Sequence, residues 1–415
     1  MSSGGLYVSQ QMRDILAQAG YISTAQGGQK LRELYREESM NLNPLALSSF
    51  ALSCFTGDYA RVKKEVEGGS APDLAGSETA YKSGYATLVI LGAQRVQDGP
   101  PGSMRHLETL NYLFSKGLPP DSEDIVGFTA LHHATTSPVQ KVDLVRCLLE
   151  HGANVNHRSR YGEISLLGSM QLNLIPTIDI LMEYNADLDL ADADGWTARK
   201  HFLACGPQVT AAVTKWIRKR TGEEAPREEK SCNACGKPSP SLKNCSKCRV
   251  ARYCSVECQK KEWPTHKKAC QPFSPSNTVV LKPYYESFGN TIPTAEFART
   301  AMGYPTQSAS WSSNRTRAAH TPKNLDETKS IVVKVQVPYS GNPHAQSTGD
   351  LLVYTKKRDF ACTIRRSDAR ADYDRISEVV RAKGVGGAKA YFAAELESRE
   401  KLVVKVSEVL AEQPW

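Results

Sequence analysis

The strongest constraint on this chain is a cluster of seven cysteines and one histidine inside forty residues. Thiolate and imidazole are the ligands that Zn²⁺ prefers, and four of them close one tetrahedral structural site. Eight ligands therefore predict two complete structural zinc sites, with no position open for water or substrate. In chain order the ligands are Cys232, Cys235, Cys245, Cys248, Cys254, Cys258, His266 and Cys270.

The segment that carries these ligands is too short and too polar to fold around an apolar core. It contains Gly236, Pro238 and Pro240, together with eleven Lys, Arg or Glu residues. Small domains of this kind rely on metals or disulfides for stability. Bound zinc is therefore expected to supply most of the folding free energy, on the order of 10 kcal/mol per ion.

A disulfide framework is the alternative use for clustered cysteines. The first ten residues lack a basic stretch followed by an apolar one, so no secretory signal is predicted. The sequence contains no run of about eighteen apolar residues, so no membrane-spanning helix is predicted. We therefore expect an intracellular protein without membrane contact, in cytoplasm or nucleus, where such cysteines bind metal. Four further cysteines lie among apolar residues and are predicted to be core residues: Cys54, Cys147, Cys205 and Cys362.

The residues around the ligands resemble those of a known family. The stretches from Ala251 to Ser255 and from Cys258 to His266, together with the ligand spacing, resemble a MYND-type zinc finger over residues 232–270. This resemblance implies that the two sites are interleaved, so losing either ion should loosen both. One ion would bind Cys232, Cys235, Cys254 and Cys258, and the other would bind Cys245, Cys248, His266 and Cys270.

The same resemblance implies a peptide-binding role. The family is known chiefly for binding proline-rich peptides, in a groove whose residues match Ser246, Gln259 and Trp263 here. An exposed indole offers a flat surface to a proline ring, and Ser and Gln can bond an extended backbone. Alternatively, Trp263 packs on the finger's own helix, with Gln259 one turn earlier on the same face. The sequence leaves both interpretations open.

Basic side chains gather in the finger. It has nine Lys or Arg against two Glu, an excess of seven that nearly equals the chain's formal net charge of +8. With seven thiolates and two zinc ions included, about +4 remains. Such a patch could contact phosphates non-specifically. The spacing of a DNA-reading zinc finger is absent, so nucleic-acid contact is the weaker alternative.

Upstream of the finger the chain repeats itself. Residues 127–134 recur loosely as 162–168 and 195–199, at intervals of 35 and 33 residues. The period and the Thr-Ala-Leu-His core resemble ankyrin repeats. Each unit would pair two short helices ended by Gly152 or Asn185, where a left-handed conformation is needed. Because one unit cannot bury its own apolar face, the units must stack.

Two weaker units, residues 45–69 and 83–117, precede these three. The predicted fold class is therefore multidomain: an all-α ankyrin-repeat solenoid, a small two-zinc MYND finger and a C-terminal α+β domain. The predicted boundaries are residues 1–40 for a helical lead-in that could cap the solenoid, 41–222 for the ankyrin repeats, 231–271 for the finger, 272–329 for a partly disordered linker, and 330–415 for a small α+β domain of unknown role.

Partners of an ankyrin stack usually dock on its concave face and loop tips.

His132 and His133 could be mistaken for ligands or catalytic bases, but the Thr-x-Leu-His pattern favours structural hydrogen bonds. Asp192 and Asp194 suggest a calcium loop, yet the ligand order of an EF-hand is missing. We expect both to be loop-tip acids.

The C-terminal domain shows a mixed pattern. Apolar residues alternate from Ile331 to Val337, which predicts a strand with one buried face. The further predicted elements are a hairpin of residues 350–355 and 360–365, a helix over 371–381 that stops near Gly384, and strands over 391–396 and 402–409.

Three functions remain. The first is a non-enzymatic adaptor that recruits protein partners through the ankyrin repeats and the finger. The second is a transcription or chromatin regulator that contacts nucleic acid through the basic finger. The third is a methyltransferase that acts through the C-terminal domain, because this type of finger also occurs inserted in SET-domain enzymes. The SET motifs are absent, as are other catalytic motifs, so no catalytic residue is predicted and the adaptor is favoured.

Overall fold

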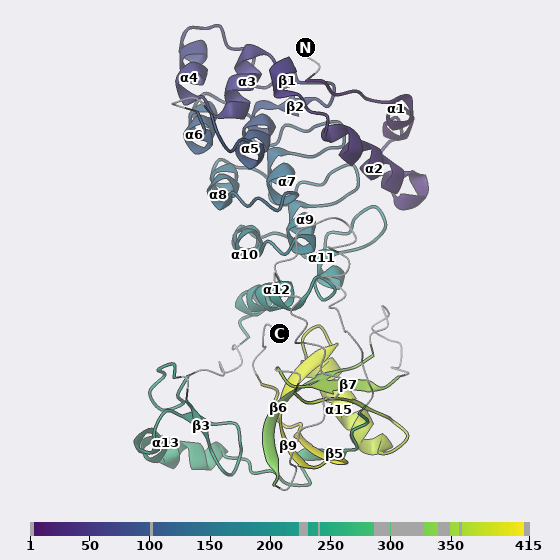
Figure 1. Ribbon diagram of the computed structural model, residues 1–415, viewed down its shortest axis with the longest axis vertical. Helices are drawn as coiled ribbons and strands as arrows, with labels where there is room; N and C mark the ends of the chain where they lie inside the picture. Colours follow the sequence, from purple (N-terminus) through teal and green to yellow (C-terminus); the bar gives the residue numbers. More distant parts are fainter. Residues whose placement is uncertain are drawn as a thin grey trace. The chain divides into compact units, whose positions relative to one another are not determined.

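The computed structural model divides the chain into two compact units (Figure 1). Unit 1 comprises Met1–Trp216 and Pro293–Gln307, and unit 2 comprises Ile217–Ile292 and Ser308–Trp415. The residues that the structure describes are 4–99, 103–223, 231–239, 241–285, 299, 327–338, 349–356 and 359–410. Most of the range predicted as a linker lies outside them.

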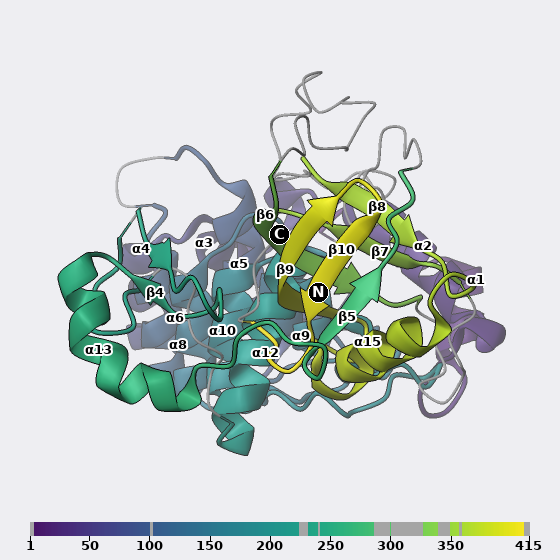
Figure 2. The same cartoon turned by 90° about the horizontal axis from the view of Figure 1, so that it is seen from below.

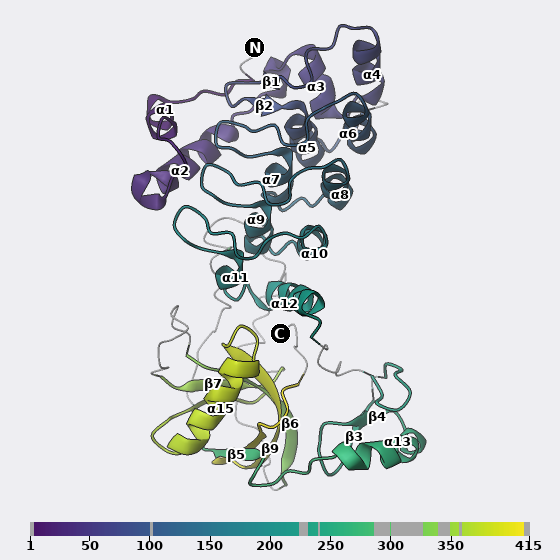
Figure 3. The same cartoon turned by 180° about the vertical axis from the view of Figure 1, so that it is seen from behind.

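Five successive helix pairs form most of unit 1. The first helices of the first four pairs pack in one column and the second helices in another (Figure 3). The pairs are α3 (Ser49–Thr56) with α4 (Tyr59–Glu67), α5 (Tyr85–Arg95) with α6 (His106–Ser115), α7 (Ala130–Thr135) with α8 (Val142–Glu150), α9 (Ser165–Gln171) with α10 (Ile175–Glu183), and α11 (Ala198–His201) with α12 (Pro207–Thr221).

Local sequence explains how these pairs form. In α8 the side chains of Leu144, Val145 and Leu148 are buried, which is the apolar stripe of an amphipathic helix. Gly152 and Asn185 follow their helices with φ of 90° and 64°, so both predicted left-handed positions are confirmed. Gly92 lets α5 approach α3, because a Cβ there would lie 1.7 Å from the backbone oxygen of Phe55.

The N-terminal segment, residues 4–39, contains α1 (Gln10–Leu16), a short 3-10 turn (Thr24–Gln26) and α2 (Gly28–Ser39). The segment packs against the loops that lead into successive pairs, the first of which holds β1 (Ser77–Glu78) and β2 (Ser83–Gly84). A role as a cap of the solenoid stays a prediction. The shared apolar cluster consists of Leu6, Met12, Ile22, Leu31, Tyr81, Val126 and Tyr161.

Unit 2 contains a six-stranded antiparallel sheet with the strand order β5-β10-β9-β6-β7-β8. Helix α15 (Arg370–Lys383) packs on it, mainly against β5 (Figure 2). In chain order the strands are β5 (Thr278–Leu281), β6 (Lys329–Gln336), β7 (Leu351–Tyr354), β8 (Ala361–Ile364), β9 (Lys389–Ser398) and β10 (Lys401–Lys405).

Strands β7 and β8 confirm the predicted hairpin, and β6, β9 and β10 confirm the three other predicted strands. Helix α15 confirms the predicted helix. The buried apolar face of β6 is confirmed, since Val333 and Val335 are fully buried in the core. The opposite face is not simply exposed, because Lys334 between them is buried as well. Strand β5 was missed, because it lies in the range predicted as a linker. Four residues, Thr278–Leu281, are too few to show a period, and only the pairing with β10 identifies them as a strand.

The chain that leaves β5 also reaches the opposite edge of the sheet. Tyr284 exchanges two backbone hydrogen bonds with Thr363 of β8, both 2.9 Å long. Since β5 is one edge strand and β8 is the other, residues 278–284 bridge the two edges. Edge strands otherwise present unpaired backbone groups to solvent.

Candidate metal centre

The finger is built from one short hairpin and one helix. Strands β3 (Lys243–Asn244) and β4 (Arg252–Tyr253) pair antiparallel, and α13 (Val256–Ala269) follows. Ser255 caps α13, because its hydroxyl accepts a hydrogen bond from the backbone N–H of Cys258 at 3.2 Å. This cap fixes the first turn of the helix, which carries one of the predicted ligands.

Two matching turns present the first four cysteines. In the first, the N–H of Gly236 donates to the carbonyl of Cys232 at 2.8 Å; in the second, the N–H of Arg249 donates to the carbonyl of Cys245 at 2.9 Å. Gly236 and Arg249 have φ of 69° and 60°. The left-handed conformation suits glycine but costs Arg249 roughly 1 kcal/mol.

The structure brings the eight residues together in the two interleaved sets that the resemblance implies. Within each set all ligand atoms lie within 4.8 Å of one another. The Sγ atoms of Cys235 and Cys254 are 3.7 Å apart, and Sγ of Cys248 lies 3.5 Å from Nε2 of His266. A tetrahedral zinc site requires separations of about 3.8 Å between two sulfurs and about 3.5 Å between sulfur and nitrogen. The two clusters thus fit two zinc ions.

Apart from the ligands, little apolar material supports the finger. Its buried cluster contains Ala251 and Tyr253 besides Cys232, Cys245 and Cys248. Burial, followed by the nearby Cys245, raises the pKa of Tyr253 to about 12. A cluster made mostly of metal ligands cannot fold such a segment by hydrophobic burial alone, which supports a structural role for zinc.

The three predicted peptide-binding residues lie on two neighbouring pieces of the finger. Ser246 is exposed in the second turn, while Gln259 and Trp263 are half-buried on α13. The ammonium of Lys247 lies 5.5 Å from the centre of the Trp263 ring. Trp263 also packs against the buried cluster of the finger, so both interpretations of this residue keep support.

Two contacts join the finger to the sheet within unit 2, and neither is predictable from the spacing of the ligands. Arg249 forms an ion pair with Glu395 of β9 at 3.1 Å. The fully buried Lys405 of β10 donates from Nζ to the carbonyl of Gln271 at 2.8 Å. One signal for the first contact was present in the sequence: Arg249 stands at the position where the matching turn has Gly236.

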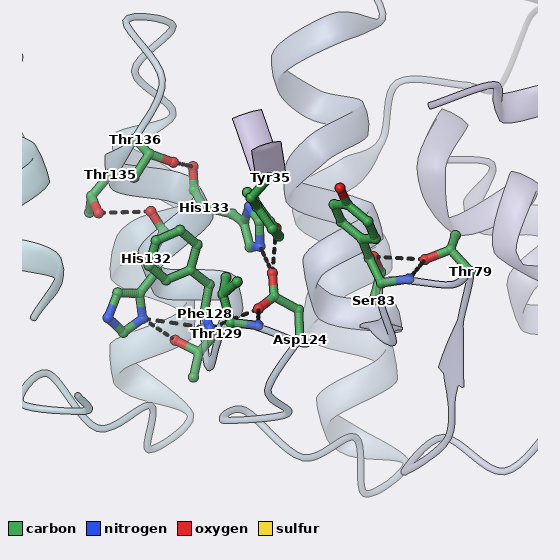
Figure 4. Close-up of polar contacts among 12 residues, drawn as sticks. Tyr35, Thr79, Ser83, Asp124, Phe128, Thr129, His132, His133, Thr135 and Thr136 are labelled. Carbon is green, nitrogen blue, oxygen red and sulfur yellow. Dashed lines mark hydrogen bonds and ion pairs between the residues drawn. The ribbon is translucent and has the colours of Figure 1, made fainter. Parts of the chain in front are cut away.

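The two histidines of the ankyrin region have structural partners (Figure 4). Nδ1 of His132 lies 3.1 Å from the hydroxyl of Thr129, and Nε2 of His133 lies 3.0 Å from a carboxylate oxygen of Asp124. The hydroxyl of Tyr35 donates to the same carboxylate oxygen. Burial lowers the pKa of His132 to about 4, so this side chain is neutral at pH 7. These contacts agree with the prediction of structural histidines.

The predicted loop acids and core cysteines outside the finger also have structural roles. Asp192 accepts hydrogen bonds from the backbone N–H groups of Asp194 and Trp196 and thereby shapes the loop. Burial raises the pKa of Cys147 and Cys205 to about 12, so these thiols are not activated. Cys54 and Cys362 are fully buried, and burial raises their pKa values as well.

Comparison with known proteins identifies two modules. Residues 232–270 match the family model of the MYND finger, and residues 126–160 match that of the ankyrin repeat. The chain therefore contains a MYND zinc finger and ankyrin repeats.

Similar curated proteins cover only parts of the chain. Histone-lysine N-methyltransferase SMYD3 from Homo sapiens is 46% identical over 56 residues, which are 12% of this chain and 13% of that protein. N-lysine methyltransferase SMYD2 from Sus scrofa is 42% identical over 57 residues, with the same two shares. Ankyrin repeat and SOCS box protein 6 from Homo sapiens is 33% identical over 144 residues, 33% of this chain and 31% of that protein.

The chain thus spans less than a third of each of these relatives, and the methyltransferase matches cover only the finger. Among solved structures, an ankyrin repeat domain from Acinetobacter baumannii is similar, with 15% identity and a TM-score of 0.34, over 40% of this chain and 80% of that one. Within the described residues, no helix is both long and apolar enough to cross a bilayer.

Proposed function

We propose that this chain is a non-enzymatic adaptor that recruits protein partners through an ankyrin-repeat solenoid and a MYND finger. The presence of both interaction modules in one chain carries this proposal. Each zinc cluster has four protein ligands, so neither leaves the open position that a catalytic zinc needs. Linking two binding modules raises the effective concentration of one partner near the other.

For the finger we propose a proline-rich peptide as ligand. Ser246 and Gln259 offer hydrogen-bonding groups, and the half-buried ring of Trp263 offers an apolar surface next to Lys247. A polyproline helix has a fully solvated backbone and flat apolar rings, so it fits such a combination. Zinc fixes α13 and the second turn, and it thereby holds these side chains in place.

A pull-down of partners tests the proposal. The full chain, a chain without residues 231–271 and the variant Trp263→Ala would be compared by quantitative mass spectrometry. We expect the deletion to lose a defined set of partners, and Trp263→Ala to bind proline-rich peptides about tenfold more weakly, as for a central interface aromatic. Zinc content should be unchanged in Trp263→Ala.

The variant Val256→Ala, which trims an exposed side chain on the same helix, is the matched control. Identical partner sets for the full chain and the deletion would exclude the finger as a recruitment surface. Unchanged peptide affinity in Trp263→Ala would mean that this side chain serves only the packing of the finger.

A further inference from the structure

The loops that lead into the ankyrin helix pairs carry a bound segment of the chain's own N-terminus. We define the hairpin-tip surface as the loops of residues 124–128, 158–163 and 191–196. Residues 16–24, which run from the end of α1 to the start of the 3-10 turn, cross this surface. Their contacts form three groups, each with its own chemistry.

The first group consists of backbone hydrogen bonds. The N–H of Ile22 donates to the carbonyl of Arg160 at 2.7 Å. The guanidinium of Arg160 donates to the carbonyl of Leu16 at 3.3 Å and also to that of Gln18. One loop residue thus holds three backbone groups of the crossing segment, and these contacts do not depend on the side chains of the segment.

The second group is apolar. Ile22 is completely buried in one cluster with Val126 and Tyr161, residues of two different loops. Tyr21, its neighbour, stays half-exposed, and the guanidinium of Arg158 lies 4.0 Å from the centre of its ring. Burial of the branched Ile22 side chain is the larger contribution to binding, and the partly exposed cation–π contact adds less.

The third group is a polar pair at the far end of the segment. Asp194 accepts hydrogen bonds from the backbone N–H and the hydroxyl of Thr24, at 2.9 and 2.7 Å. Helix α2 then adds an ion pair between Arg32 and Glu163 at 2.8 Å. The surface therefore selects an apolar residue at the position of Ile22 and a hydroxyl residue two positions later, at the position of Thr24.

We propose that the hairpin-tip surface is a peptide-binding surface that residues 16–24 occupy in cis. The partner that fits is a protein with a segment carrying an aromatic residue, a branched apolar residue next to it and a hydroxyl residue two positions further on. This inference rests on the proposed function, since it names a surface and a partner chemistry for the ankyrin unit. Because the tethered segment acts at a local concentration on the order of millimolar, a partner binds only when it competes with that segment.

A peptide supplied in trans tests this proposal on the full chain. The probe is a fluorescent peptide of residues 4–39, and its affinity would be measured by fluorescence anisotropy. The chain variant Ile22→Asp/Thr24→Ala weakens the cis segment but leaves the hairpin-tip surface intact. We expect this variant to bind the probe at least a hundredfold more tightly than the natural chain does.

Four further variants complete the test. A probe that itself carries Ile22→Asp should bind neither chain, and the chain variant Val139→Asp, changed at an exposed residue elsewhere, should behave like the natural chain. Adding Asp194→Ala to the double variant should lower the affinity again. Thr24→Ala alone removes one hydrogen bond of an exposed residue, so folding is preserved, and it should raise probe affinity about tenfold.

Two results would overturn the proposal. One is a folded double variant, judged by circular dichroism, that does not bind the probe. The other is a pair of observations: the double variant shows no cooperative unfolding transition, and Thr24→Ala alone binds the probe no more tightly than the natural chain does. The segment would then be an inseparable part of the unit. Either result leaves recruitment by the finger untouched, so the two proposals fail separately.

Discussion

At the scale of single residues, the ankyrin region buries an ionisable ring that must stay neutral. The side chain of His132 in unit 1 is only 3% exposed to solvent. The ring of His157 lies 5.7 Å from the His132 ring, and His133, Asp124 and the carbonyl of Glu163 also surround it. Burial is the largest influence on its pKa, and the neighbouring histidines act in the same direction. Protonating His132 therefore destabilises the folded chain.

The pH dependence of stability follows from this pKa. His132 titrates near 4 in the folded chain, against an ordinary value of 6.5, so the unfolded chain takes up the proton first. Neutral His132 therefore contributes roughly 3 kcal/mol to the free energy of unfolding above pH 6.5, and this contribution is lost as the pH falls towards 4. We expect thermal melts between pH 7 and 4 to show a shallower loss of stability in His132→Gln than in the natural chain.

His151→Gln is the control for this measurement, because His151 is exposed on the same unit. This variant should keep the full pH dependence. Equal slopes in the natural chain and in His132→Gln would show that other groups control the acid sensitivity.

At the scale of elements, the finger combines ligands from both ends of its sequence. Cys254, just before α13, and Cys258, in its first turn, complete the set begun by Cys232 and Cys235. The second set closes around the end of the same helix with His266 and Cys270. Helix α13 is thus a member of both sites, so loss of one ion removes one of its two attachments.

The variant Cys254→Ser tests this dependence. We expect it to lose the first ion outright and to hold the second about tenfold or more weakly, because α13 is no longer fixed at its start. Inductively coupled plasma mass spectrometry after dialysis against a weak chelator measures the zinc content. A variant that retains one full equivalent with natural affinity would contradict the coupling. Cys362→Ser, which changes a cysteine in the core of the sheet, serves as control for thiol loss.

The elements also show which features the sequence can predict. The eight ligands predicted two zinc sites, and the family resemblance implied how the ligands divide between them. The loose repeat around Thr-Ala-Leu-His predicted the helix pairs, because such signals are local. The placement of residues 4–39 and the membership of β5 in the sheet were not predictable. Both depend on partners far away in the sequence, such as Arg160 for Ile22 and β10 for β5. Peptide binding by Trp263 stays a prediction.

At the scale of the whole molecule, the two units have separate cores. Unit 1 buries its apolar residues between helices, and unit 2 has a sheet core besides the small cluster of the finger. Zinc supports only the finger directly. Removal of metal should therefore affect the molecule unevenly.

Chelation of zinc tests this unevenness. With excess EDTA we expect fast hydrogen exchange throughout residues 232–270, while the helices of unit 1 keep their protection. Circular dichroism should show that most of the helical signal remains. A finger that stays equally protected after exhaustive chelation would contradict zinc-dependent folding, and loss of protection in α5 or α7 would show that zinc also stabilises unit 1.

The pairing of β5 has a practical consequence for expressing parts of this protein. A fragment that begins at residue 330, where the sequence pattern suggested a boundary, would leave β10 with a bare outer edge and would remove the bridge from Tyr284 to β8. Such exposed edges recruit strands from other molecules, so this fragment should precipitate or form fibres. A fragment that starts before Thr278 retains its own edge protection and is the better choice for crystallisation.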